Sequence, residues 1–124
     1  MTRDRTILNG LVLFGVLFQG LSAGLFMAHL DAPGWLRVHQ VTAIATIVLA
    51  LVAVILAIRR RALVGPTIGL FVLLVLQTGL GQAIADDHER ALLAAHVPIA
   101  VLVTALSAYL FVAAARVREV SASS

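Results

Sequence analysis

The sequence predicts an all-α fold, a transmembrane bundle of four helices that run alternately up and down. Of the 124 residues, 61% are hydrophobic and only 12% are charged, which is more apolar surface than a soluble domain of this size can bury. The apolar residues fall into four runs, each long enough to cross a hydrocarbon core of about 30 Å. Short polar connections separate the runs, so neighbouring helices are expected to be antiparallel.

The four expected spans belong to a single membrane domain, residues 1–124, and cover about 7–29, 35–58, 63–85 and 91–115. Each span should be helical, because backbone groups without hydrogen-bond partners are not tolerated in lipid. The first run has a charged start, and SAGLFMA near its end is a weak cleavage motif for a signal peptide. Its apolar part is long for a signal peptide, so we expect it to remain as a span.

The connections and their charges predict the orientation in the membrane. Residues 30–34 read as a turn, Arg59–Arg61 joins the second and third spans, and Asp86–Arg90 joins the third and fourth. Seven arginines, at positions 3, 5, 59, 60, 61, 116 and 118, lie on the side of the two termini, and only Arg37 and Arg90 lie on the other. The positive-inside rule therefore places both termini in the cytoplasm of a multi-pass protein of the bacterial plasma membrane.

Composition also excludes several kinds of site. The chain has no cysteine, which excludes disulfides, thiolate-bound metals and covalently attached c-type haem. The net charge of +3 comes from arginines at the ends of the apolar runs. They form no basic patch with interleaved aromatic residues, so we expect no nucleic-acid partner.

The two halves of the chain resemble each other. A shift of 57 positions places His39 on His96 and Gly24 on Gly81, and also superimposes arginines at the ends of the spans. We interpret this as two copies of a helical hairpin. Chance matches in such a biased composition are the alternative.

His39 and His96 are the candidate metal ligands. Each lies 20 residues before its matching arginine, about 30 Å along a helix, so both rings are expected at the same depth near the outer face. The second and fourth helices of a cyclic bundle are diagonal neighbours. Two imidazoles facing each other across the bundle axis suit a bis-histidine haem, whose iron takes one nitrogen from each side. A lone histidine near an interface is more often simply hydrogen-bonded, and the pairing is what favours ligation.

Small and basic residues complete the predicted haem site. Small residues on the first and third spans would let the backbone approach the macrocycle, and they are Gly15, Gly20, Ser22, Gly24, Gly79 and Gly81. Arg37, with Arg90 at the rim, would pair with the propionates. The alternative for the glycines is helix packing, which the spacings Gly20-x-x-x-Gly24 and Gly65-x-x-x-Gly69 fit equally well.

Other polar residues have simpler interpretations. Gln19, Gln77 and Gln82 lie inside spans, and interhelical hydrogen bonds are favoured over contact with a quinone or a haem edge. His29 and His88 are expected in solvated loops. A zinc or copper site made of all four histidines lacks tight ligand spacing.

Three short motifs resemble one half of the haem A synthase family: LRVHQ (36–40), LQTGLG (76–81) and AAHVPIA (94–100). The resemblance extends to small bacterial four-span proteins with this histidine pattern. It implies a four-helix bundle in which His39 and His96 are axial haem ligands. The family's catalytic half has a glutamate where this chain has Leu36, and one half lacks the second haem, so haem A synthesis is not expected.

These observations predict a membrane-bound b-type cytochrome that holds one haem b and transfers electrons rather than catalysing a reaction. Its partners would be the lipid bilayer and a redox protein or quinone. Two alternatives stay open. One is a non-catalytic accessory subunit of a homo-oligomer or a larger membrane complex, and the other is an assembly factor that carries haem as cargo.

Overall fold

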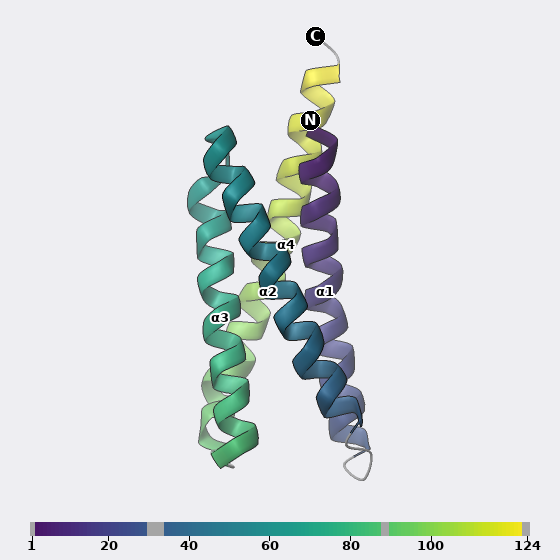
Figure 1. Ribbon diagram of the computed structural model, residues 1–124, viewed down its shortest axis with the longest axis vertical. Coiled ribbons are helices and arrows are strands. Elements are labelled where there is room, and N and C mark those ends of the chain that lie inside the picture. The colour runs from purple at the N-terminus through teal and green to yellow at the C-terminus, as the bar shows by residue number, and fades with distance from the viewer. Residues whose placement is uncertain (1, 30–33, 88–89, 123–124) are drawn as a thin grey trace.

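The computed structural model describes residues 2–29, 34–87 and 90–122, and this part of the chain is almost entirely helical (Figure 1). Its elements are α1 (Thr2–Ala28), α2 (Gly34–Arg60), α3 (Val64–Asp87), the short 3-10 helix η1 (Arg90–Leu92) and α4 (Leu93–Ala122). The predicted all-α bundle of four helices is confirmed. The predicted turn at residues 30–34 lies outside the described residues except for Gly34, which begins α2.

Each helix of the bundle contacts two of the other three. α1 packs against α2 and α4, and α3 also packs against α2 and α4. The pairs α1–α3 and α2–α4 make no close backbone contact within the described ranges. The second and fourth helices are therefore diagonal, as the sequence predicts for a cyclic up-and-down bundle.

The outer surface of the bundle is suited to lipid. Four stretches are long and apolar enough to cross a membrane, and they are Arg3–Ala28, Gly34–Arg60, Val64–Ala85 and Leu93–Arg116. Large apolar side chains point away from the bundle, for example Phe14, Met27 and Val101, each about two-thirds exposed at 66%, 67% and 65%. Water would penalise so much exposed apolar surface, so the chain is built as a multi-pass membrane protein.

The turn between α2 and α3 stops α2 with a defined hydrogen-bond pattern. Arg61 donates its backbone N–H to Ile58 O and Ala62 donates to Ala57 O, both at 3.1 Å. This pair of bonds is the Schellman pattern, which closes a helix through one left-handed residue. Arg61 takes that place with a φ of 50°, although glycine is the usual residue there.

The two ends of the bundle are packed differently. We call the end with both termini and the α2–α3 turn the arginine end, and the opposite end the histidine end (Figure 1). The buried apolar cluster lies in the arginine-end half and at mid-bundle, and it consists of Val12, Val16, Ala50, Leu70, Leu74, Val103 and Leu110. Beyond mid-bundle toward the histidine end, Ser22 alone is buried among the residues with described side chains.

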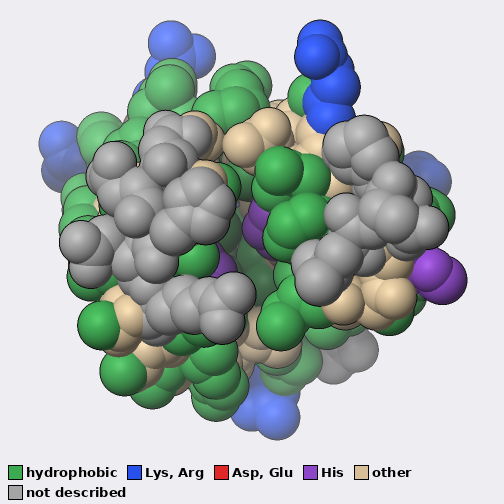
Figure 2. Space-filling view, turned by 90° about the horizontal axis from the view of Figure 1, so that it is seen from below, with side chains coloured by type: hydrophobic (Ala, Val, Ile, Leu, Met, Phe, Trp, Pro, Cys, Tyr) green, Lys and Arg blue, Asp and Glu red, His purple; other side chains and the backbone are tan. Residues whose placement is uncertain are grey.

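The histidine end opens into a hollow. Along one ridge of α1, Val12 and Val16 are buried, whereas Gly20 and Gly24, one and two turns further on, are exposed. Figure 1 shows the α1–α2 pair separating from the α3–α4 pair toward this end. In Figure 2 the same end is hollowed at its centre, and histidine side chains are visible inside the hollow.

Candidate functional site

His39 lies in the second turn of α2 and is held by α1. Its Nδ1 is 3.0 Å from the hydroxyl oxygen of Ser22, and that hydroxyl donates to the carbonyl of Gln19 at 3.1 Å. When the hydroxyl proton is used on Gln19, the Ser22 oxygen accepts from Nδ1–H. In that tautomer the lone pair of the neutral ring is on Nε2, the form in which histidine binds a metal.

Gln19 fixes the backbone around His39. Its amide Nε2 donates to the carbonyl of His39 at 3.1 Å and also to the hydroxyl of Thr42. The interhelical hydrogen bonding predicted for Gln19 is thereby confirmed. Two residues of α1 therefore hold His39 in place: Ser22 contacts its ring, and Gln19 contacts its main chain.

His96 lies in the first turn of α4, and its ring packs on α3. A Cβ atom placed on Gly81 would come within 3.1 Å of Cε1 of this ring, which is tighter than an ordinary van der Waals contact. Gly81 therefore provides the space that the ring occupies. His39 and His96 lie toward the same end of the bundle, on the diagonal helices α2 and α4.

Two buried polar atoms in this region lack partners. Among the described residues, Nδ1 of His96 and Oε1 of Gln77 are the buried side-chain atoms without a hydrogen bond. The backbone of Gln77 lies next to the His96 ring. Each buried atom left unpaired costs about 1–3 kcal/mol, so this region carries unused hydrogen-bonding capacity.

The chemistry of these donors and acceptors fits a metal-bound imidazole pair. A ligating histidine usually donates its second ring N–H to an oxygen, which fixes the ring and the tautomer. Ser22 offers that oxygen to His39. Gln77 carries an unused oxygen on the helix that packs against His96. These two oxygens are the side-chain groups of α1 and α3 that could support imidazole ligands on α2 and α4.

Four of the predicted site residues lie at the histidine end without contacting either ring. Arg37 is exposed on an open depression of ≈ 380 Å³ along α2, which neither histidine lines. Gly20, Gly24 and Gly79 are exposed, and a Cβ on any of them would meet nothing within 4 Å. The side chain of Arg90, the second arginine predicted at the rim, lies outside what the structure describes.

Glycines do allow close packing of helices in this bundle, but not at the Gly-x-x-x-Gly positions that the sequence indicated. A Cβ on Gly65 would meet nothing within 4 Å, and one on Gly69 would make only an ordinary contact with Leu106 at 3.9 Å. The close approaches are at Gly15, where a Cβ would lie 2.5 Å from Thr46 Oγ1, and at Gly10, where it would lie 3.3 Å from Phe111. The Gly-x-x-x-Gly spacing in the sequence did not identify these two positions as sites of close helix packing.

The remaining polar residues do not form a second centre in the described part of the chain. No group of three or more histidine, aspartate and glutamate side chains there could hold a metal ion. His29 is exposed just after α1, and His88 lies outside the described residues. Gln82 accepts a long hydrogen bond of 3.5 Å from Gln40, which fits the interhelical role predicted for it.

Comparison of the chain with family models, with curated proteins and with solved structures finds no match. The resemblance to half of a haem A synthase therefore stays a prediction.

Proposed function

We propose that this protein is a membrane b-type cytochrome that binds one haem b between α2 and α4, with His39 and His96 as its axial ligands. The observation that supports this most strongly is the position of two half-buried imidazoles on diagonal helices at the hollowed end of the bundle, one of them hydrogen-bonded through Nδ1 to Ser22. When bound, haem supplies a one-electron redox centre. Held by His39 and His96, the iron would have no open ligand position, so electron transfer is favoured over oxygen activation.

The protein's own residues would orient and protect the centre. Ser22 holds the ring of His39 in the tautomer that presents Nε2. Gly81 leaves room for the ring of His96. The apolar helices around the hollow would exclude water and retain the macrocycle without a covalent link.

The charge distribution supports the membrane orientation that belongs to this proposal. Described arginines gather at the arginine end, whereas the histidine end carries Arg37. By the positive-inside rule the termini face the cytoplasm of a bacterial cell and the histidines lie toward the outer face. A quinone or a redox protein would then exchange electrons from that side.

The test is an absorption spectrum of the detergent-purified protein from haem-replete cells. We expect a sharp Soret band that shifts on reduction with dithionite, and we expect His39→Ala and His96→Ala to lose it. His29→Ala is the matched control, because His29 is exposed outside the bundle. Circular dichroism should show that all variants keep their helices. A colourless wild-type protein, or a full Soret band in both site variants, would contradict the proposal.

A milder substitution tests the role assigned to Ser22. Ser22→Ala removes the oxygen 3.0 Å from Nδ1 of His39 but leaves both ligands in place. Loss of such a supporting partner typically lowers metal affinity about 10–100-fold. Haem titration of the haem-free protein measures this change, and unaltered affinity would remove Ser22 from the site.

A second candidate function is that of an accessory subunit without haem. It is favoured by the exposed, open faces of Gly20 and Gly24, onto which another membrane helix could pack. The double variant His39→Ala/His96→Ala separates the two functions. Under the accessory function the variant assembles with its partner as the wild type does, and neither protein is coloured.

A further inference from the structure

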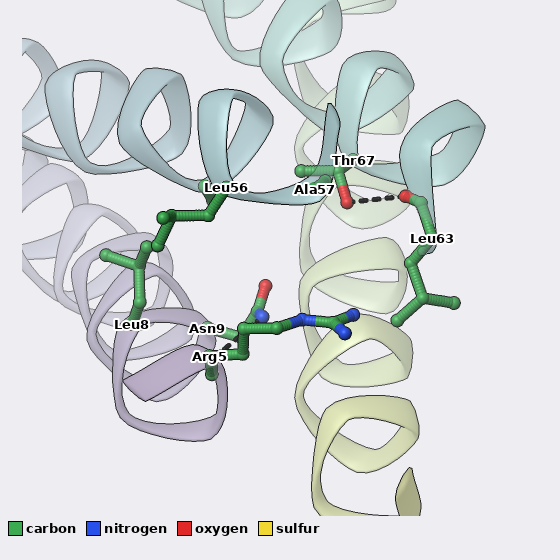
Figure 3. Close-up of a pocket in the computed structure, with 8 residues that line it drawn as sticks. Arg5, Leu8, Asn9, Leu56, Ala57, Leu63 and Thr67 are labelled. Carbon is green, nitrogen blue, oxygen red and sulfur yellow. Dashed lines mark hydrogen bonds between the residues drawn. The ribbon is translucent and has the colours of Figure 1, made fainter. Parts of the chain in front are cut away.

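A small cavity lies at the arginine end, at the opposite end of the bundle from the histidines (Figure 3). It is formed between α1, α2 and α3, has a volume of ≈ 10 Å³, and is lined by Arg5, Leu8, Asn9, Ala53, Leu56, Ala57, Leu63 and Thr67. About 10–15 Å³ is the space that one water molecule requires. The cavity can therefore admit a single oxygen atom, but not a whole polyatomic ion.

Arg5 is the charged group of this cavity. It is only 8% exposed, whereas Arg3, Arg59 and Arg61 are exposed. Its side chain extends from α1 past Asn9 toward Leu63 (Figure 3). No hydrogen bond or ion pair of its guanidinium is present among the described residues, and none of its nitrogens is among the fully buried unpartnered atoms. The charge is therefore mostly buried but still reachable, and an anionic ligand would offset the cost of its burial.

The other polar groups of the cavity are already engaged. The amide of Asn9 donates to the carbonyl of Arg5 at 2.9 Å, and the hydroxyl of Thr67 donates to the carbonyl of Leu63 at 2.7 Å. Arginine has five N–H donors in a planar fork. The hydrogen-bonding groups of the cavity that remain unused are therefore mainly the positively charged N–H donors of Arg5.

The start of α3 adds to this positive potential. Leu63 precedes the helix, and its carbonyl accepts the first helical bond from the N–H of Thr67 at 3.1 Å. Because leucine has no side-chain oxygen, it cannot cap the first N–H groups of the helix. The positive end of the α3 dipole thus lies beside the guanidinium of Arg5, and both favour an anion.

We propose that this cavity receives one oxygen of the phosphate group of an anionic phospholipid, which Arg5 binds. Arginine suits phosphate because its fork can donate two parallel hydrogen bonds. The cavity lies where α2 ends and α3 begins, at the level of the headgroups. Ile7, Ile58 and Ile68 are exposed near this level, at 52%, 52% and 39%, and offer apolar surface to the acyl chains. Free inorganic phosphate presents the same oxygens to Arg5, so the experiment below compares the lipid with inorganic phosphate.

The experiment measures binding of phosphatidylglycerol to the full chain in a non-ionic detergent, by native mass spectrometry and by the unfolding temperature. We expect bound lipid in the wild type and about tenfold weaker binding in Arg5→Gln, which loses the charged fork. Arg3→Gln is the matched control, because it removes an equal charge from an exposed arginine two residues away. Diacylglycerol, which lacks phosphate, should not bind at this site in any variant.

Two further arms keep the result decisive. Ala57→Val narrows the cavity without changing the charge, and it should also weaken binding of phosphatidylglycerol, so the proposal can be tested even if Arg5→Gln fails to fold. Inorganic phosphate is compared with chloride at equal ionic strength. Equal lipid binding by wild type and Arg5→Gln would overturn the proposal. Stabilisation by inorganic phosphate, but not by the lipid, would overturn the lipid as the source of the phosphate.

Discussion

The two halves of the bundle differ in how they use their interiors. In the arginine-end half, apolar side chains are almost completely buried, with Leu110 at 0% and Val12 at 1% exposed. Beyond mid-bundle toward the histidine end, helices diverge around a hollow, and Ser22 is the one residue with a described side chain that is buried. One half therefore supplies most of the packing that stabilises the bundle, while the other is left incompletely packed around half-buried polar groups.

Hydrogen bonds between helices occur in both halves of the bundle. Toward the arginine end, the hydroxyl of Thr6 on α1 donates to the carbonyl of Ala114 on α4 at 3.3 Å, whereas the hydroxyls of Thr67 and Ser107 donate to the carbonyl four residues earlier in their own helix. Toward the histidine end, Ser22 and Gln19 reach from α1 to α2. Bonds within a helix satisfy a polar group without specifying a neighbour, whereas bonds between helices fix the position of one side chain relative to another.

The largest effect should come from opening a cavity in the packed half. Leu110→Ala removes a side chain that is 0% exposed, and such changes cost about 2–5 kcal/mol in well-packed cores. Val101→Ala is the control, because Val101 is 65% exposed on the lipid-facing surface. Reversible unfolding in mixed detergent micelles would compare the two variants. Equal losses would mean that the packed half does not hold the bundle together.

The sequence was sufficient for the fold, but not for the surroundings of the two candidate histidines. The lengths of the apolar runs predict four helices, and short connections predict their antiparallel order. Depth along a helix follows from counting, which is why His39 and His96 could be paired. The contacts of Ser22 and Gly81 depend on the rotation of each helix about its axis. Helices that are apolar on every side give little indication of that rotation.

The glycines show the same limit. Gly20 and Gly15 lie on one helix and look alike in the sequence, yet a Cβ on Gly15 would collide with Thr46 and a Cβ on Gly20 would meet nothing within 4 Å. The difference arises from where α2 and α4 approach α1 and where the hairpins separate. No local spacing rule contains that information.

This pair of glycines gives the second prediction, of intermediate size. Gly15→Ala places a methyl group 2.5 Å from the hydroxyl oxygen of Thr46, so α1 and α2 must move apart. Overpacking of this kind costs about 1–3 kcal/mol. Gly20→Ala should leave stability unchanged or raise it slightly, since alanine favours the helix. The same unfolding assay measures both variants, and a larger loss for Gly20→Ala would reverse the assignment of the tight and open halves.

The smallest predicted effect concerns the histidine end and has the opposite sign. Gln77→Leu removes a buried oxygen that has no partner, and we expect the haem-free protein to gain about 1 kcal/mol of unfolding free energy, because an unsatisfied group no longer has to be buried. If that oxygen serves the ring of His96 when haem is bound, the same variant should bind haem more weakly. Unfolding with and without haem measures both quantities. A variant that is less stable without haem would show that Gln77 contributes to packing, and the division between a stabilising half and a ligand-binding half would then have to be drawn closer to the histidines.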